Sequence, residues 1–524
     1  MSMVSNTPMQ AGLRYWNSVH PDRVAVAVGA SALSYQRLEQ QANRLARVFD
    51  TFGLARGDHV AALLPNDPFV IVVAWAAYRR GLYFTPVSTA LSTPDAAYIL
   101  RDCQAKLVMA QGPAKCVLTE LPGLVGNGNI TWLSHGEPIT GFESVESRMA
   151  QQADGASDTE CAGALMMYTS GTTGFPKGVW RPLPDAAYVG PPTFAADLIT
   201  VFRLDADSRY LLSGPLYHAA SLRAALAVTS SGGSAICLQK FDAEAALHTV
   251  MVERVTHSQW VPTMLQRMLR LPDEVRRRYH APDHRLAWHA AAPCPISVKR
   301  AMIDWWGPII MEYYAGTESV GMSVIDAQEW LAHPGSVGRV LRGVPHILDD
   351  DWNEVPTGQA GRIYFSGLTA FQYFGDPAKT AERTSPQGYQ TLGDIGYIDV
   401  DGFMYLTDRM DDMIISGGVN VYPQEIEAAI IDMPEVVDVG VIGVADDDYG
   451  ERPVAFVAGA QNADPVALEQ LVRAHCEKRL GTIKRPVRYV VMQELPRSAA
   501  GKMLRRELRK LVDAAPTSGI APRR

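Results

Sequence analysis

The sequence has few cysteines, and their spacing argues against a disulfide framework or a cysteine-based metal site. Its 524 residues include six cysteines and no C-x-x-C pair. They are scattered along the chain at Cys103, Cys116, Cys161, Cys237, Cys294 and Cys476. Isolated thiols of this kind are typical of a reducing compartment. We therefore expect free thiols in a cytoplasmic protein.

Long apolar runs are also missing. The longest, Phe69 to Tyr78, is too short to cross a bilayer and ends in Arg79-Arg80. It follows Asn66-Asp67-Pro68, a pattern typical of a helix start, so we expect a buried helix here and no transmembrane segment. Residues Met1 to His20 lack a basic start followed by an apolar core, so we expect no signal peptide.

The chain has no overall excess of positive charge. Its formal net charge of -8 and pI near 5.9 argue against a general nucleic-acid binder. The charge is uneven, however: from Arg473 to Arg524 there are 14 Lys/Arg and 4 Asp/Glu, a local excess of 14 − 4 = +10. This run is either a solvated helix face or a binding surface for a polyanionic ligand.

Short apolar segments alternate with helical segments from Gly57 onward, which predicts an α/β fold with parallel sheets covered on both faces. After about Gly335 the pattern favours short antiparallel strands, and thus a small β-rich subdomain. Past Asp411 a compact α+β unit is expected. The predicted organisation is an N-terminal domain at 1–408, a hinge at 409–411, a mobile C-terminal domain at 412–513 and a disordered tail at 514–524.

A loop rich in glycine and hydroxyl side chains follows a predicted strand, Ala164 to Met167. Residues 168–178 read Tyr-Thr-Ser-Gly-Thr-Thr-Gly-Phe-Pro-Lys-Gly. Glycines let backbone N–H groups approach an anion, hydroxyls add donors, and lysine adds a positive charge. The lysine sits between Pro176 and Gly178, which does not fit the Walker pattern. The segment is either a phosphate-binding loop or a polar turn that binds nothing.

This loop resembles the signature loop of the adenylate-forming superfamily, which comprises acyl- and aryl-CoA synthetases, luciferases and peptide-synthetase adenylation domains. Five further segments resemble motifs of that family in order and spacing, so the resemblance covers nearly the whole chain. It implies a large N-terminal domain of layered sheets with helices and a small, mobile C-terminal domain. It also implies that the loop binds ATP through Thr169, Ser170, Gly171, Thr172, Thr173, Gly174 and Lys177.

The segment Glu312 to Glu318 resembles the family's Y-G-x-T-E element. The resemblance implies that Tyr314 stacks on adenine, that Thr317 holds the α-phosphate and that Glu318 binds Mg²⁺. The alternative is a pair of core aromatics beside a surface acid. Upstream, the backbone around Ala291 resembles the stretch that borders the adenine ring.

Two short motifs resemble the ribose site and the hinge of the family. In Thr391-Leu392-Gly393-Asp394, the aspartate would accept both ribose hydroxyls, which suits a carboxylate with two acceptor oxygens. Leu392 stands where the family has threonine. Arg409 resembles the ribose-binding arginine and Asp411 the hinge residue, although Asp411 is also consistent with an ordinary linker acid.

The C-terminal part resembles the segments that serve the two half-reactions. Gly417 and Gly418 would line the pantetheine tunnel of CoA, with Tyr449 and Arg485 near the same ligand. Lys502 resembles the lysine that reaches the carboxylate and the α-phosphate during adenylation, where its charge would stabilise developing negative oxygens.

The segment Pro215 to Ala220 resembles the P-L-x-H element of CoA ligases. His218 would gate the acyl pocket, unless it is a structural histidine. By resemblance the pocket residues are Ala219, Ala220, Tyr313, Ala315 and Val320. No charge among them could meet an amine or a second carboxylate, whose burial would cost several kcal/mol. An apolar acid is therefore expected. No role is predicted for Trp180-Arg181-Pro182.

The resemblance implies an AMP-forming acyl-CoA synthetase that uses ATP, Mg²⁺ and coenzyme A. The carboxylate would attack the α-phosphorus of ATP, and the CoA thiol would then displace AMP from the acyl-adenylate. A fatty acid is the first choice of substrate. An aryl, arylpropenoic or steroid acid, an acyl-AMP ligase that serves a carrier protein, and a catalytically silent nucleotide-binding protein are the alternatives. A homodimer is left open.

Overall fold

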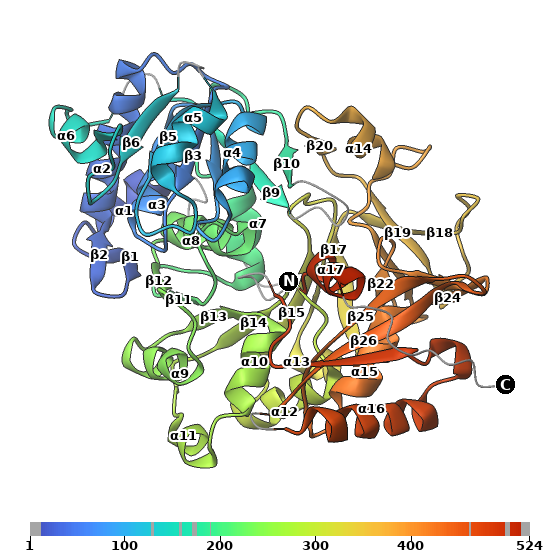
Figure 1. The fold of residues 1–524 in the computed structure, drawn as a ribbon. Coiled ribbons are helices and arrows are strands. Elements are labelled where there is room, and N and C mark those ends of the chain that lie inside the picture. Colours follow the sequence, from blue (N-terminus) through green and yellow to red (C-terminus); the bar gives the residue numbers. More distant parts are fainter. Residues whose placement is uncertain are drawn as a thin grey trace.

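The computed structural model describes residues 12–126, 130–156, 160–169, 176–188, 190–460, 463–497 and 503–514. The chain forms a large α/β part followed by a smaller α+β part, which confirms the predicted fold class (Figure 1). The centre of the glycine-rich loop, Lys502 and most of the predicted tail lie outside the described residues. The predicted domain and hinge boundaries stay predictions.

The first sheet is parallel and has helices on both faces. Its order is β7 (Glu143–Ser144), β6 (Thr131–Ser134), β5 (Ala105–Ala110), β3 (His59–Leu63), β4 (Tyr83–Pro86), β8 (Ala164–Leu165). Alternate residues of β3 enter different cores. Val60 packs with helices α2 (Tyr35–Thr51) and α3 (Phe69–Arg79), whereas Ala61 packs with α4 (Thr93–Asp102). The expectation of a doubly covered parallel sheet is thus confirmed.

A second sheet joins the parallel and β-rich regions. Its parallel strands are β1 (Val24–Val28), β12 (Ser234–Cys237), β11 (Arg209–Leu212), β13 (His257–Trp260), β14 (Leu286–His289) and β15 (Ile310–Ala315). Beyond β15 the pairing is antiparallel, through β16 (Met322–Ile325), β17 (Ser336–Arg342), β22 (Met404–Arg409), β21 (Asp394–Ile398), β19 (Gly361–Ser366) and β18 (Val344–Leu348). At the other end, β2 (Ser31–Ser34) pairs antiparallel with β1. The change from parallel to antiparallel pairing at β15 marks the place where the predicted site begins.

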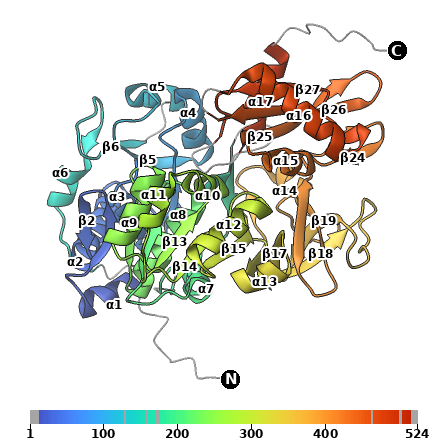
Figure 2. The ribbon, with the colours of Figure 1, turned by 90° about the horizontal axis from the view of Figure 1, so that it is seen from below.

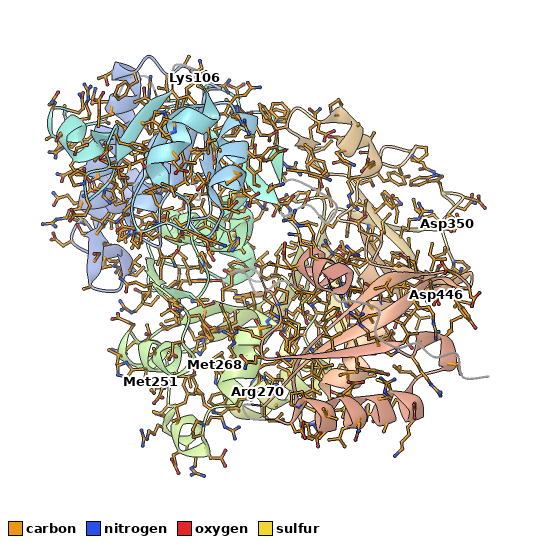
Figure 3. All side chains as sticks on the ribbon, in the orientation of Figure 1. Lys106, Met251, Met268, Arg270, Asp350 and Asp446 are labelled. Atoms are coloured by element: carbon orange, nitrogen blue, oxygen red, sulfur yellow. The ribbon has the colours of Figure 1, made fainter. Side chains whose placement is uncertain are left out.

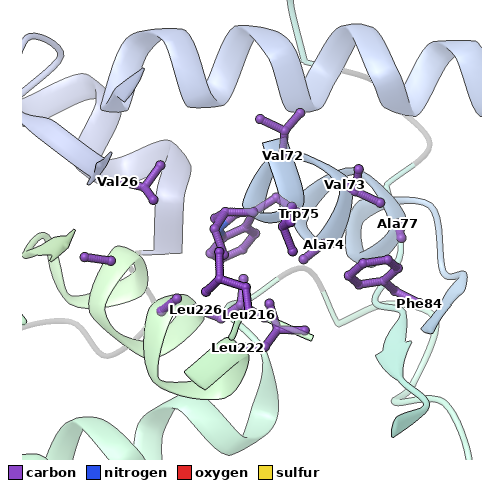
Figure 4. Close-up of a cluster of buried hydrophobic side chains, with 14 of the residues drawn as sticks. Val26, Val72, Val73, Ala74, Trp75, Ala77, Phe84, Leu216, Leu222 and Leu226 are labelled. Atoms are coloured by element: carbon purple, nitrogen blue, oxygen red, sulfur yellow. The ribbon is translucent and has the colours of Figure 1, made fainter. Parts of the chain in front are cut away.

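Helices α3 and α8 (Ala219–Ser231) form the apolar layer between the two sheets. Trp75 of α3 lies against Leu222 and Leu226 of α8 within one cluster of buried side chains (Figure 4). The indole N–H of Trp75 donates to Thr229 Oγ1 at 3.2 Å, so its polar atom is satisfied inside the core. The apolar run that the sequence predicts as a buried helix is therefore the centre of the N-terminal core.

The C-terminal part is a separate five-stranded sheet covered by helices. Long strands β25 (Val436–Asp446) and β26 (Gly450–Gly459) form a hairpin. Both β27 (Arg488–Met492) and β23 (Ile414–Ser416) pair with β26, and β24 (Val419–Val421) pairs with β23. Helices α15 (Pro423–Ile431), α16 (Pro465–Arg479) and α17 (Arg505–Ala514) complete it. Figure 2 shows this part packed against one side of the N-terminal part.

The remaining helices and short strands connect these layers. They are α1 (Gly12–Val19), α5 (Leu121–Val125), α6 (Val145–Ala150), α7 (Thr193–Phe202), α9 (Ala243–Val252), α10 (Pro262–Leu269), α11 (Asp273–Arg278), α12 (Ile296–Trp306), α13 (Ala327–Ala332), α14 (Pro377–Glu382), β9 (Met167–Thr169), β10 (Lys177–Trp180) and β20 (Gln372–Tyr373). The cysteines in the described residues are free thiols. Among those residues, no helix is both long and apolar enough to cross a membrane.

Candidate active site

The candidate site lies where several strands of the large sheet end. His218 follows β11, Ala291 follows β14, and Tyr314, Thr317 and Glu318 lie at or just past the end of β15. Because β11, β14 and β15 are parallel, their carboxyl ends share one edge of the sheet, where α/β folds bind ligands. Ala291 adopts a φ of +76°, a conformation that a non-glycine residue holds only where its surroundings require it.

The glycine-rich loop joins the two strands of a hairpin beside this edge. Thr169 of β9 pairs with Lys177 of β10, and β10 pairs in turn with β20. The loop residues Ser170, Gly171, Thr172, Thr173 and Gly174 lie outside the described residues. Lys177 Nζ lies 4.9 Å from the ring centroid of Tyr373, and burial next to cationic neighbours lowers its pKa. A positive charge therefore stands at one end of the loop.

Tyr373 connects the hairpin to the carboxylate predicted to bind Mg²⁺. Its hydroxyl donates to Glu318 Oε1 at 3.1 Å, and its ring carries the Lys177 ammonium on one face. Tyr373 was not predicted as a site residue, because nothing in its local sequence distinguishes it from a core aromatic residue. Only the pairing of β20 with β10 brings it to the site.

Glu318 is a suitable ligand for a divalent cation. Within the described residues, Tyr373 is the only side chain that donates a hydrogen bond to its carboxylate, through Oε1. Its other oxygen, Oε2, is therefore available to a ligand. A partly buried carboxylate oxygen is the type of donor that Mg²⁺ prefers, so the chemistry of this side chain fits the ion.

Tyr314, Asp394 and Arg409 form a network at the predicted ribose position. The Tyr314 hydroxyl donates to Asp394 Oδ2 at 2.7 Å, and Arg409 Nε donates to Asp394 Oδ1 at 3.1 Å. The Asp394 charge raises the pKa of Arg409, although burial acts in the opposite direction. Leu392, the departure from the family pattern, packs over Gly316: a Cβ added at Gly316 would lie 2.3 Å from Leu392 Cδ2. The three predicted nucleotide residues are thus brought together.

The predicted hinge residue is held from the N-terminal part. Arg383 Nη2 donates to Asp411 Oδ2 at 2.5 Å. The same guanidinium lies against Gly393, whose φ is +86° and whose added Cβ would lie 2.2 Å from Arg383 Nη1. Gly393 therefore leaves space for the arginine that pairs with Asp411. Lys502 lies outside the described residues.

The residues predicted to contact CoA also lie together, on the surface of the C-terminal part. Gly417 N–H donates to the Tyr449 carbonyl at 2.7 Å, and Gly417 and Gly418 are exposed with φ of +56° and +78°. Ile483 borders the same turn. Arg485, two residues further on, donates to the Leu480 and Glu477 carbonyls at the end of α16. Its guanidinium is thus already engaged as a helix cap.

The predicted acyl-pocket residues separate into two groups. Tyr313, Ala315 and Ala219 belong to the main apolar cluster or pack against it. Val320 instead lies in a different cluster with Phe365, beside a cavity of about 160 Å³, and Ala220 is exposed. His218 precedes the first turn of α8, where its ring lies edge-on to Tyr217. The wall behind Tyr313 is aromatic, with Phe202 and Trp288 at ring-centroid distances of 5.6 and 6.1 Å.

Two arginines near the pocket were not assigned a role from the sequence. Arg181 donates to the Thr369 carbonyl and, at 2.6 and 3.2 Å, to the carbonyls of Glu318 and Ser319. Arg223 of α8 donates to Ser319 Oγ at 2.9 Å and to the Thr317 carbonyl at 3.1 Å. Ser319 has a φ of +51°, so the two side chains hold a strained turn just after Glu318. The expectation of a pocket without charge stays a prediction.

Comparison with known proteins places this geometry in a family. The family model "AMP-binding enzyme" matches residues 13–373, and the model of the AMP-binding enzyme C-terminal domain matches residues 425–502. The long-chain-fatty-acid–CoA ligase FadD13 of Mycobacterium tuberculosis is 31% identical over 496 residues, which cover 92% of this chain and 93% of FadD13. The 2-succinylbenzoate–CoA ligase of Geobacillus kaustophilus is 31% identical over 97% of this chain and 98% of its own.

A solved structure shows the same architecture. ATP-bound MatB from Rhodopseudomonas palustris superposes with a TM-score of 0.79 at 27% sequence identity, covering 96% of this chain and 99% of MatB. Both the N-terminal sheets and the C-terminal part lie within this superposition, and the family models match both parts of the sequence. The chain therefore belongs to the AMP-binding enzyme family, within the adenylate-forming superfamily.

Proposed function

We propose that this AMP-forming acid–CoA ligase activates a carboxylic acid with an apolar body, a fatty acid or an aryl acid, by way of an acyl-adenylate. The observation that carries the proposal is the network of Tyr314, Asp394 and Arg409 next to Glu318 at the carboxyl end of β15. The relatives that share the family include ligases for a fatty acid and for an aromatic acid, which supports both acid classes.

The residues of the site have separate tasks in this reaction. Asp394 and Arg409 hold the ribose of ATP while Tyr314 supports the adenine, and Lys177 brings positive charge to the phosphates. Glu318 would hold Mg²⁺, which neutralises phosphate charge when it is bound. No covalent enzyme intermediate is needed, because positioning and charge neutralisation lower the barrier to attack by the carboxylate on the α-phosphorus. Lys502 serves this first step.

The aromatic wall favours an acid whose apolar body ends near Tyr313. Phe202 and Trp288 are fully buried and fill the space behind this tyrosine. An acyl group that enters past Ala315 gains about 0.8 kcal/mol for each buried methylene until it meets this wall. Short fatty acids and aryl acids should therefore be better substrates than long-chain ones.

The proposal is tested by a screen for AMP release over a panel of fatty and aryl acids, with and without CoA. We expect AMP release that depends on both the acid and CoA, with kcat/KM rising with chain length until the acyl group meets the aromatic wall and falling for longer chains. Release of pyrophosphate without any CoA-dependent formation of AMP would favour an acyl-AMP ligase that serves a carrier protein. Absence of acid-dependent pyrophosphate release would contradict an adenylating enzyme altogether.

A further inference from the structure

A buried ion pair joins α12 to β15, the strand that leads into the candidate site. Lys299 Nζ of α12 donates to Glu312 Oε2 of β15 at 2.6 Å, and the two side chains are 0% and 9% exposed. The Lys299 ammonium also lies 4.9 Å from the ring centroid of Trp330. The proposed reaction uses neither of these two charged groups directly.

Glu312 holds both ends of the segment that connects β14 to α12. At one end it is paired in register with His289, the last residue of β14. At the other end its carboxylate binds Lys299, which lies in the first turn of α12. The segment between them, residues 290–295, contains Ala291 with its φ of +76°. The ion pair therefore closes a short loop whose backbone is predicted to border the adenine ring.

The same strand connects Glu312 to the other predicted adenine contact. Tyr314 lies two residues further along β15, so its side chain leaves the strand on the same face as that of Glu312. The Tyr314 hydroxyl donates to Asp394 Oδ2 at 2.7 Å, which fixes the far end of its side chain. A shift of β15 against α12 would therefore change the spacing between the Ala291 backbone and the Tyr314 ring.

Stability alone does not account for this buried pair. Apolar side chains of similar volume in place of a buried ion pair are often neutral or stabilising, because both charges lose their hydration on folding. His289 brings no compensating hydrogen bond: its Nε2 lies 3.6 Å from Glu312 Oε2, and neither ring nitrogen has a hydrogen-bond partner among the described residues. The ion pair instead favours one arrangement of α12 against β15, the one in which its two charges meet.

We propose that Lys299 and Glu312 are positioning residues that give this ligase its selectivity for ATP over other nucleoside triphosphates. The inference rests on the proposed function and on its nucleotide site. Because both side chains are buried, the pair acts through the backbone of residues 290–295 and through Tyr314. The alternative is that the pair only stabilises the fold, in which case its loss would affect ATP and GTP alike.

The test replaces the pair by two apolar side chains of similar volume in the whole enzyme, as Lys299→Met with Glu312→Met. The Tm should be unchanged or higher. In assays of pyrophosphate release, kcat/KM for ATP should fall by about ten- to hundredfold. The ratio of kcat/KM for ATP to that for GTP should fall by about tenfold, while the KM for the acid stays the same.

Glu312→Gln is the conservative variant, because it keeps the size of the side chain and an oxygen that accepts from Lys299. It should give an ATP-to-GTP ratio between those of the wild type and the double variant. If the double variant does not fold, Glu312→Gln decides the question by itself: a reduced ratio supports the inference, and a wild-type ratio overturns it.

Arg79→Met with Glu39→Met is the matched control, because this ion pair is also buried but joins α3 to α2 in the N-terminal core. It should keep the ATP-to-GTP ratio of the wild type, whatever its effect on Tm. An unchanged ratio in Lys299→Met with Glu312→Met overturns the inference, and so does an equal fall of the ratio in the control. Absence of acid-dependent pyrophosphate release from the wild type would instead contradict the proposed function.

Discussion

Asp394 is the side chain on which the nucleotide site depends most. It is buried and accepts hydrogen bonds from Tyr314 on one oxygen and from Arg409 on the other. Because β21 and β15 are separate strands of the sheet, this carboxylate also links the β-rich region to the strand that carries the Thr317–Ser319 turn. A substitution at Asp394 should therefore affect both the binding of the ribose and the position of Arg409.

We expect Asp394→Asn to raise the KM for ATP by about ten- to hundredfold, which corresponds to a lost charge-assisted hydrogen bond of ~1.5–3 kcal/mol. The amide keeps the size of the side chain but loses the charge that pairs with Arg409. Pyrophosphate release as a function of ATP concentration measures the effect. Tyr314→Phe is the control, since it removes one hydrogen bond and keeps the ring. An unchanged KM in Asp394→Asn would contradict the ribose assignment.

The sequence identified the residues of the nucleotide site far better than those that support it. Tyr314, Asp394 and Arg409 were predicted and are brought together, because each belongs to a motif with a recognisable local pattern. Arg181 and Arg223 were not, because an arginine beside a motif looks like a surface residue until its distant carbonyl acceptors are known. Trp180-Arg181-Pro182 now has an account: Arg181 holds the turn after Glu318.

At the scale of elements, the buried helix predicted over Phe69 to Tyr78 is α3, and the strand predicted over Ala164 to Met167 corresponds to β8 and the start of β9. The order of the strands could not be predicted, since pairing such as β20 with β10 joins segments that are nearly two hundred residues apart. The direction in which a side chain points beyond the end of a strand also depends on contacts with distant parts of the chain. Val320 therefore lies with Phe365 rather than with Ala315.

The turn between β23 and β24 allows a matched test of CoA binding. A methyl group added at Gly417 would lie 3.1 Å from Tyr449 Cδ1, whereas one added at Gly418 would meet no atom within 4 Å. Both residues have positive φ, so each alanine variant bears a similar backbone strain of order 1 kcal/mol. We expect Gly417→Ala to slow thioester formation from supplied acyl-adenylate more than Gly418→Ala does.

The readout for this pair is CoA-dependent release of AMP, measured beside pyrophosphate release in the same preparations. Pyrophosphate release should be similar in the two variants, because neither glycine is among the residues predicted to bind ATP. Equal loss of the CoA step in both variants would mean that Tyr449 does not contribute to the CoA surface.

Asp408 gives β22 a pH dependence of stability. It is buried, and it accepts hydrogen bonds from the backbone N–H groups of Arg409 at 2.7 Å and of Gln424 at 3.1 Å. Burial raises the pKa of Asp408 to about 7, above its unfolded value near 3.8. The folded state then binds the proton more tightly, so this group stabilises the fold most at low pH, and that contribution is lost as the pH rises from about 4 through 7.

We expect Asp408→Asn to remove the loss of stability that the Asp408 carboxylate causes as the pH rises. The amide oxygen can still accept a backbone hydrogen bond but carries no charge. The fall in Tm between pH 5.5 and pH 8.0 should be smaller in the variant than in the wild type. One pKa unit corresponds to about 1.4 kcal/mol, so a difference on the order of 1 kcal/mol or more is expected. Identical pH profiles of Tm would show that burial does not shift the Asp408 pKa.

At the scale of the whole molecule, hydrogen bonds from the N-terminal part hold the C-terminal part in the observed orientation. Arg270, just past α10, donates to the carbonyls of Val436 and Val437 at 3.2 and 2.9 Å. Ser297 Oγ donates to Asp432 at 2.9 Å nearby. Figure 3 labels Arg270 near the border between the two parts. In this orientation Gly417 and Gly418 are exposed to solvent. We propose that this orientation serves the adenylation step.

Arg270→Ala should therefore weaken adenylation selectively. Although the Arg270 side chain is exposed, its guanidinium satisfies two carbonyls of β25, and its loss costs about 1–3 kcal/mol in this orientation only. We expect slower pyrophosphate release, by about five- to hundredfold, with thioester formation from supplied acyl-adenylate unchanged or faster. Arg267→Ala is the matched control on α10, because the pair of Arg267 with Glu494 at 3.7 Å is exposed and worth little. If Arg270→Ala slowed both half-reactions equally, Arg270 would support the fold of the interface rather than the choice between two orientations.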